Sequence, residues 1–186
     1  GLWYAANEAE HSLPYSVSGE QPWQKIAERE SAVMQHGAVL LDLTPFTKID
    51  VSGHDALALL NHLAAAQIDV AVGRAVYTPL LNGGGGIEAD VTITRLAVDR
   101  FRLVSGAATR RRDMALIRRA AGKHDVTVSD VTEDDCVIGV MGAAARRILE
   151  GLSPDDWQDF PFATARTVTL SGATCLATRL SYVGEL

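Results

Sequence analysis

The order of elements in this sequence predicts an α+β fold in which antiparallel sheets pack against helices. Strand-like runs follow one another through short turns, and helix-like segments fall between groups of strands. Two of the turns carry glycine signals, the four glycines at 83–86 and the pair Ser171-Gly172. Short turns of this kind join antiparallel strands, whereas parallel strands need long crossovers.

The first expected element is a helix. Residues 1–21 show no periodic pattern and carry aromatic and turn residues. Pro22 and Trp23 should open a helix that runs to about residue 35. Its expected apolar stripe is Ile26, Val33 and Met34. Gly37 then supplies its stop.

The remaining elements are hairpins separated by short helices. A β-turn-β-α opening precedes the central hairpin around the four glycines, and a third strand and a basic helix follow. A later strand leads through Gly142 into another helix, and the last hairpin turns at Ser171-Gly172. The predicted strands are 38–43, 47–52, 75–81, 87–97, 101–104, 126–131, 136–141, 164–170 and 174–181, and the predicted helices are 22–35, 55–66, 109–121 and 143–152.

Composition and charge exclude several classes of protein. The 186 residues include 17 Lys and Arg against 23 Asp and Glu, a net charge of −6 that argues against nucleic acid or an anionic membrane as the main partner. No apolar run approaches the roughly 18 residues of a membrane span, and the start lacks a signal-peptide pattern, so we expect a cytoplasmic chain. The histidines are scattered without metal-ligand spacing, and Cys136 and Cys175 are expected to be buried thiols.

The central hairpin is the strongest functional signal. Glycines at 83–86 allow a flat ligand or another backbone to come close, and Asp90 follows on the next strand. The alternative is an ordinary hairpin loop with a solvent-facing Asp, which is the commoner meaning of such a pattern. Asn82 is expected to form the turn and not to bind a ligand.

The residues of this hairpin resemble a known family. The run Tyr77-Thr-x-x-Leu-Asn82, followed by Gly85-Gly-Ile-x-x-Asp90-x-Thr-Ile-Thr-Arg95, is similar to the folate-binding domain of the glycine cleavage T-protein family. It is more similar still to the C-terminal half of dimethylglycine and sarcosine dehydrogenases. The other segments that resemble the family, in its order, are 42–56, 101–105, 130–132, 139–146 and 179–186. Several motifs in the same order across nearly the whole chain indicate the family far more specifically than a single motif does.

The resemblance implies a fold and a domain organisation. Family members fold as a three-lobed clover leaf with folate in a central channel. By this comparison residues 50–135 form one complete lobe, and 22–49 and 136–186 form part of a second lobe, truncated at its C-terminus. Residues 1–21 resemble a strap that leads out of an upstream flavin domain, whose FAD would lie outside this chain.

The resemblance also implies the site residues. Tyr77 and Glu185 match positions that hold the folate pterin, and a carboxylate such as Glu185 can accept two parallel hydrogen bonds from its N–H groups. Val104 and Gly106 match walls of the same pocket, although the T-protein tends to carry a polar amide at the latter position. Asp90 matches the carboxylate at the reacting nitrogens, where an anion stabilises a developing positive charge or relays a proton.

The implied function is tetrahydrofolate-dependent transfer of one carbon from an amine-derived intermediate, giving 5,10-methylenetetrahydrofolate, as in sarcosine or dimethylglycine demethylation. Ala89 stands where many T-proteins carry a second acidic residue, which favours the demethylating relatives. The first alternative is the glycine cleavage aminomethyltransferase, whose partner is a lipoyl carrier protein. The second is a folate-binding or scaffold domain without catalysis.

A basic cluster follows the central hairpin. Its members are Arg110, Arg111, Arg112, Arg118 and Arg119. A polyglutamate tail of folate is one conceivable partner, but a solvated helix face is the preferred interpretation, because Met114, Leu116 and Ile117 already define a buried side.

Overall fold

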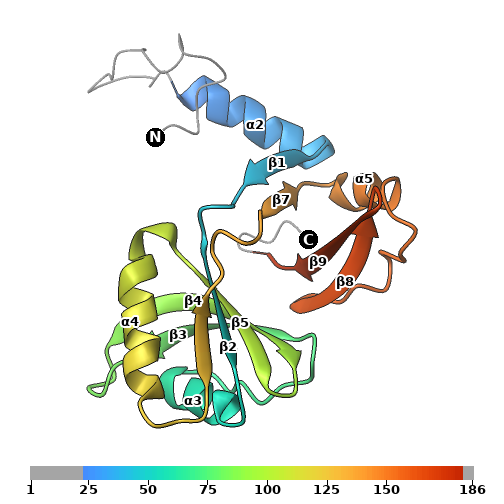
Figure 1. The fold of residues 1–186 in the computed structure, drawn as a ribbon. Coiled ribbons are helices and arrows are strands. Elements are labelled where there is room, and N and C mark those ends of the chain that lie inside the picture. The colour runs from blue at the N-terminus through green and yellow to red at the C-terminus, as the bar shows by residue number, and fades with distance from the viewer. Residues whose placement is uncertain (1–22, 182–186) are drawn as a thin grey trace, which may run out of the picture.

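The computed structural model describes residues 23–181, and its elements lie in two groups (Figure 1). The predicted strap at 1–21 and the predicted pterin ligand Glu185 lie outside the described residues. The strands are β1 (Val39–Asp42), β2 (Thr47–Ser52), β3 (Ala75–Leu81), β4 (Ile87–Ala97), β5 (Arg100–Ser105), β6 (Thr127–Asp130), β7 (Ile138–Met141), β8 (Thr164–Leu170) and β9 (Ala173–Arg179). The helices are α2 (Gln24–His36), α3 (Ala56–Leu63), α4 (Arg110–Ala121) and α5 (Ala145–Glu150), with a 3₁₀ turn η2 (Ala107–Thr109).

The predicted α+β class is confirmed, and every predicted strand and helix is present. The predicted apolar stripe of α2 is wrong in part, because Ile26 is buried but Val33 and Met34 are exposed. Helices α3 and α5 are shorter than predicted, with 8 and 6 residues. Helix α3 ends early because Ala64 turns to an extended conformation and bridges to Leu80 of β3. Helix α5 starts late because Gly142, with φ 120°, first turns the chain out of β7.

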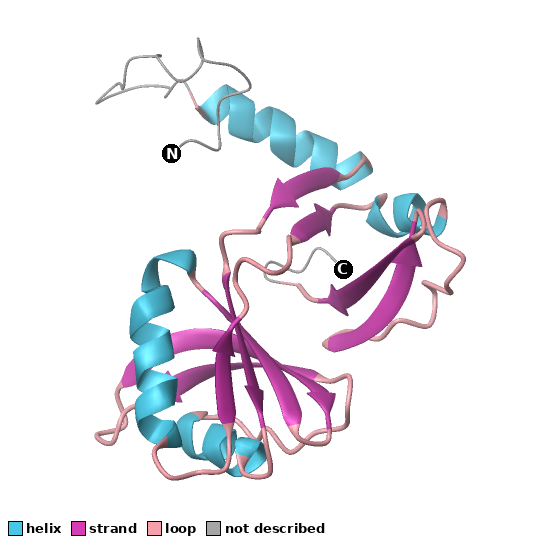
Figure 2. Cartoon of the chain, viewed as in Figure 1, coloured by secondary structure: helices cyan, strands magenta, loops and turns pink. Residues whose placement is uncertain are grey.

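The larger group is a five-stranded antiparallel sheet covered by α3 and α4 on one face. The strand order is β3-β4-β5-β2-β6, so β2 lies between two strands that follow it in sequence. One face carries the main core, which joins Ile49 and Phe101 of the sheet to Leu60 of α3 and Ile117 of α4. Figure 2 shows these helices packed against the sheet, apart from the second group of elements.

Alternate residues point to the other side of this sheet. In register, Tyr77 pairs with Thr92, Thr92 with Val104, and Val104 with Lys48. Residues paired across neighbouring strands share one face, and this face is turned away from the core of α3 and α4. We call it the second face of the sheet; its members are Lys48, Asp50, Tyr77, Pro79, Asp90, Thr92, Thr94, Arg102 and Val104.

The smaller group contains two two-stranded sheets, β1-β7 and β8-β9, with α2 and α5. Gly142 fits only because it lacks a side chain, since a Cβ there would lie 2.6 Å from Gly37 O. The β8-β9 hairpin is tied to the larger sheet by backbone hydrogen bonds from Ala165 N to Gly73 O at 2.6 Å and from Ala75 N to Ala163 O at 2.9 Å.

Two segments of chain, 43–46 and 131–137, run between the groups and are bonded to each other and to β2. Leu43 N donates to Val137 O, and Lys48 N donates to Thr132 Oγ1. The Lys48 side chain is 1% exposed, and its Nζ donates to Thr44 O at 2.9 Å and Phe46 O at 3.1 Å. Burial lowers the pKa of Lys48. The buried amino group of Lys48 therefore supplies hydrogen bonds to two carbonyl groups of the connecting segment.

The expectation that both cysteines are buried thiols is wrong for Cys136. Its side chain is exposed and Cys175 is partly buried, and neither thiol is in a disulfide. The reason is that β7 starts at Ile138 and not at residue 136, so Cys136 lies in the connecting segment. None of the helices within residues 23–181 is long and apolar enough to cross a membrane.

The Arg110–Asp130 ion pair predicts a pH dependence of stability. Arg110 Nε lies 2.6 Å from Asp130 Oδ2, and this contact, with hydrogen bonds from Thr132, lowers the pKa of Asp130 from 3.8 to about 2. A carboxyl whose pKa is lower in the folded state stabilises that state above its unfolded pKa. The contribution should be complete above about pH 4 and should disappear as the pH falls towards 2.

The measurement is urea unfolding between pH 5 and pH 2 of the wild type and of Asp130→Asn. The variant should be less stable at pH 5, and the difference from the wild type should shrink as the pH falls. Asp134→Asn is the control, because the Asp134 side chain has no hydrogen bond or ion pair within residues 23–181. A constant difference between pH 5 and pH 2 would contradict the expectation.

Candidate functional site

Three of the predicted site residues, Tyr77, Asp90 and Val104, lie together on the second face of the sheet. Tyr77 on β3 and Val104 on β5 flank Thr92 of β4 in one continuous row. The Tyr77 side chain is 63% exposed, and Val104 is partly buried. The row offers an aromatic ring and an aliphatic side chain at the surface, as a flat heterocyclic ligand requires.

Asp90 lies one row further along β4. It pairs with Pro79 on β3, and continuing the β4-β5 register by one residue beyond Val91↔Ser105 places Gly106 opposite it. The carboxylate is exposed and has no hydrogen bond or ion pair within residues 23–181. The Asp90 carboxylate is therefore accessible from the surface of the sheet.

Gly106 leaves space beside this carboxylate. Its backbone has φ −62°, which any residue adopts, and a Cβ there would meet nothing closer than Thr109 Oγ1 at 3.8 Å. Neither the backbone nor the packing of the described residues requires glycine at this position. The absent side chain instead leaves open volume next to Asp90, which fits a wall that a ligand approaches closely.

A buried carboxylate holds the chain around Gly106. Asp113 of α4 is 1% exposed and accepts hydrogen bonds from Ser105 Oγ at 2.7 Å and Thr109 Oγ1 at 2.6 Å. Gly106 O is 3.1 Å from Thr109 Oγ1 and accepts a hydrogen bond from Thr47 Oγ1, also at 3.1 Å. These contacts join the turn after β5 to α4 and β2, so the backbone at Gly106 is held in place by contacts within the chain. Asp113 is not among the predicted site residues, although its position next to Met114 on the buried side of the helix was a visible signal.

The glycine turn is built by its own asparagine. Asn82 Oδ1 accepts from Gly84 N and Gly86 N, both at 2.9 Å, and Asn82 Nδ2 donates to Glu88 Oε1 at 2.8 Å. The expectation that Asn82 forms the turn is confirmed. Its side chain is therefore already engaged.

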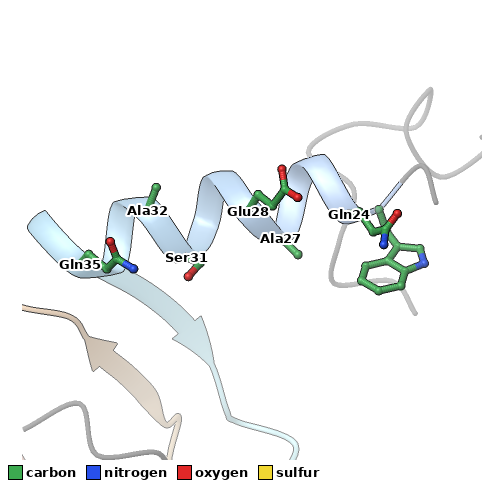
Figure 3. A pocket seen from close by; sticks show the side chains of 7 residues that line it. Gln24, Ala27, Glu28, Ser31, Ala32 and Gln35 are labelled. Carbon is green, nitrogen blue, oxygen red and sulfur yellow. The ribbon is translucent and has the colours of Figure 1, made fainter. Parts of the chain in front are cut away.

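Two surface hollows found among residues 23–181 lie away from the row of Tyr77. One, of about 410 Å³, is lined by Trp23 and residues of α2 alone, and Figure 3 shows these side chains spaced along that single helix. The other, of about 590 Å³, follows α4 and is lined by Arg110, Arg111, Met114, Ala115, Arg118 and Asp130. Helix α4 packs on the core face of the sheet, whereas Asp90 lies on the second face. The arginines of α4 are therefore on the opposite side of the sheet from a ligand bound beside Asp90. This placement, and the exposure of Arg111, Arg112, Arg118 and Arg119, support a solvated helix face.

Charged groups of the second face pair with one another further from Asp90. Arg102 donates to both oxygens of Asp50, at 2.7 and 3.1 Å, and to Asp135 Oδ2 at 2.7 Å. These bonds raise the pKa of Arg102, with the Asp50 bond the largest cause. Among the described residues, no three His, Cys, Asp or Glu side chains form a group that could hold a metal ion.

The fold defines an α+β domain in which one face of an antiparallel sheet carries the candidate site residues. The chain belongs to the GCVT N-terminal domain family, which matches residues 1–186. It is 39% identical over 186 residues to 4-methylaminobutanoate oxidase (formaldehyde-forming) of Paenarthrobacter nicotinovorans, covering 99% of this chain and 22% of that protein. It is 33% identical over 168 residues to mitochondrial dimethylglycine dehydrogenase of Mus musculus, covering 88% of this chain and 19% of that protein.

A solved structure supports the same assignment. The glycine cleavage system aminomethyltransferase T of Bartonella henselae superposes with a TM-score of 0.68 at 25% identity, covering 74% of this chain and 37% of that one. The chain spans about a fifth of the length of the oxidase and of the dehydrogenase named above. The resemblance inferred from the motifs is confirmed.

Proposed function

We propose that this chain is the tetrahydrofolate-binding part of an enzyme that transfers one carbon from an amine-derived intermediate to folate. The observation that carries the proposal is that Tyr77, Asp90 and Val104, each matched to the family's pocket, lie on two adjacent rows of one sheet face. Gly106 directly follows β5 and lies next to this pair of rows when the β4-β5 register is continued by one residue.

The residues present suit the ring of folate. Tyr77 offers an exposed ring for stacking, Val104 offers apolar contact, and the missing side chain at Gly106 leaves room for the ligand beside Asp90. Glu185, outside the described residues, is proposed from its motif to accept hydrogen bonds from the pterin. Folate, when bound, supplies the nitrogens that receive the carbon.

Asp90 carries the chemical part of the proposal. Its free carboxylate would lie beside nitrogens that gain positive charge as the carbon is transferred, and a fixed anion stabilises that charge. The same carboxylate can take up a proton from the attacking nitrogen and return it to solvent. Val104 and Tyr77 would orient the ring so that the reacting atoms meet Asp90 and not water.

We place the reaction among amine demethylations. The relatives at 39% and 33% identity are named as an oxidase and a dehydrogenase of methylated amines, which supports an upstream flavin domain with FAD as the source of the oxidised amine. The second candidate is the glycine cleavage aminomethyltransferase with a lipoyl carrier protein, favoured by the superposition on that enzyme. Activity with sarcosine or dimethylglycine, against activity with an aminomethyl-lipoyl carrier, separates the two.

Gly106→Val tests the site without disturbing the fold. The nearest atom to a Cβ at Gly106 is 3.8 Å away and φ is −62°, so the melting temperature should hold. Isothermal titration of (6S)-tetrahydrofolate into the full natural polypeptide that carries this chain should give at least about tenfold weaker binding, because the new side chain fills the ligand space.

Gly83→Val is the matched control, since a Cβ at Gly83 meets nothing within 4 Å and Gly83 lies in the glycine turn. It should bind folate as the wild type does. Equal binding by wild type and Gly106→Val would refute the assigned wall. If folate binds normally but no amine donor supports turnover, the domain is a binding or scaffold module.

A further inference from the structure

Asp113 is a buried carboxylate that the proposed transfer reaction does not use. It lies in the first turn of α4, and its side chain is 1% exposed. Its Oδ2 atom accepts hydrogen bonds from Ser105 Oγ at 2.7 Å and from Thr109 Oγ1 at 2.6 Å. These two donors lie on either side of residues 106–108, so one carboxylate oxygen holds both ends of the turn that contains Gly106.

The turn of residues 106–108 has little else to hold it on the side of α4. Its sequence is Gly-Ala-Ala, and all three residues are exposed. Such small, exposed side chains bury little apolar surface, so packing contributes little to the position of the turn. On the side of β2, Gly106 O accepts a hydrogen bond from Thr47 Oγ1 at 3.1 Å. Towards α4, the turn is held by the two hydroxyl groups that donate to Asp113.

A role in helix stability explains a carboxylate in the first turn of α4 but not its burial. Negative charge near a helix N-terminus is favourable, yet an exposed Asp supplies this effect without loss of hydration. An apolar side chain would join α4 to the core, as Met114 and Ile117 do, without burial of a charge. The buried carboxylate is instead explained by the fixed geometry that it gives to its two hydroxyl donors.

We propose that Asp113 is a positioning residue, which sets the place of the Gly106 wall relative to the Asp90 carboxylate and so the width of the folate site. The inference rests on the proposed function and adds a residue of α4, a helix that packs on the core face and not on the candidate site. Hydrogen bonds to an ionised acceptor are shorter and stronger than neutral ones, so a carboxylate holds the turn firmly. A wall that is held in place costs less ordering when the ligand binds.

The test compares Asp113→Ala with Asp113→Asn by titration of (6S)-tetrahydrofolate into the full natural polypeptide, below the melting temperature of each variant. Alanine suits a helix but removes the acceptor. Asparagine can place its carbonyl oxygen where Oδ2 lies and can accept from both hydroxyl groups. Asp113→Ala should bind about tenfold more weakly with unchanged stoichiometry. Asp113→Asn should stay within about threefold of the wild type, because the acceptor remains.

Ser105→Ala tests the inference even if Asp113→Ala fails to fold, because it removes one of the two links and leaves the carboxylate in place. It should weaken folate binding by about three- to fivefold. Ser153→Ala is the matched control, since Ser153 Oγ also donates to a carboxylate, Asp155 Oδ2 at 3.1 Å, but lies in the smaller group. Its affinity should stay within about twofold of the wild type.

A role in stability alone would give a different titration. The number of sites per chain would then fall because fewer molecules are folded, and the remaining sites would have the dissociation constant of the wild type. That result overturns the inference. Wild-type affinity of Asp113→Ala and Ser105→Ala, with weakened binding by Gly106→Val, also overturns the inference but leaves the proposed function standing. If the wild type binds no folate, both fall.

Discussion

Replacement of Asp90 by asparagine should lower the turnover of one-carbon transfer by about 10²- to 10⁴-fold, the range for loss of a charge or proton acceptor at reacting atoms. Asparagine keeps the size of the side chain but removes its negative charge. Asp90 is exposed and has no hydrogen bond or ion pair in the described chain, so the substitution breaks no structural contact there. Folate binding should stay within a few-fold of the wild type, because stacking and wall contacts remain.

The measurement pairs steady-state turnover with titration of (6S)-tetrahydrofolate on the same preparation. Asp99→Asn serves as the control, because Asp99 is also exposed and its side chain is unpaired among the described residues. It lies in the turn between β4 and β5, away from the row of Tyr77. Turnover of Asp90→Asn within a few-fold of the wild type would exclude a catalytic carboxylate at this position. A loss of binding as large as the loss of turnover would make Asp90 a binding residue.

The second large effect is on stability, at the turn between β2 and α3. Gly53 has φ 130°, and a Cβ there would lie 2.4 Å from Asp125 O and 2.9 Å from Val126 Cα. Both contacts are with backbone, which cannot rotate away. Gly53→Ala should therefore lower the free energy of unfolding by about 2–5 kcal/mol, the sum of backbone strain and overpacking.

Urea unfolding followed by circular dichroism measures this change. The control is Gly83→Ala, because a Cβ at Gly83 meets nothing within 4 Å. Its free energy of unfolding should change by less than about 1 kcal/mol, and the loss of backbone freedom in the unfolded chain favours a small gain. If the two alanine variants unfold at the same urea concentration, the result contradicts the claim that residues 125–126 leave no space for a side chain at Gly53.

Local patterns predicted the elements of this fold well, because hydrophobic period and turn chemistry are properties of short segments. The choice of partners for distant strands could not be predicted in the same way. Strand β1 pairs with β7, and β2 inserts between β5 and β6. Strand alternation shows that one face is buried but does not show which strand lies alongside. Lys48 illustrates the limit, since its burial depends on a connecting loop that covers it.

For the site, motif resemblance predicted Tyr77, Asp90 and Val104 around one pocket, and the structure has these residues on one face of the sheet. The hydrogen bonds of Asp113 could not be predicted in this way, because its donors come from β5 and η2 and their approach depends on the folded chain. Glu185 stays a prediction.

The position of β2 biases the order in which the sheet can assemble. Strands β3, β4 and β5 are consecutive, so their pairing closes only short loops. Pairing of β2 instead closes long ones, as between Lys48 N and Thr132 Oγ1, 84 residues apart. Because closure entropy grows with the logarithm of loop length, this step costs roughly 2 kcal/mol more than closing a tight turn. Topology therefore favours early formation of the strands that carry Tyr77, Asp90 and Val104, with the strand that links the two groups added afterwards.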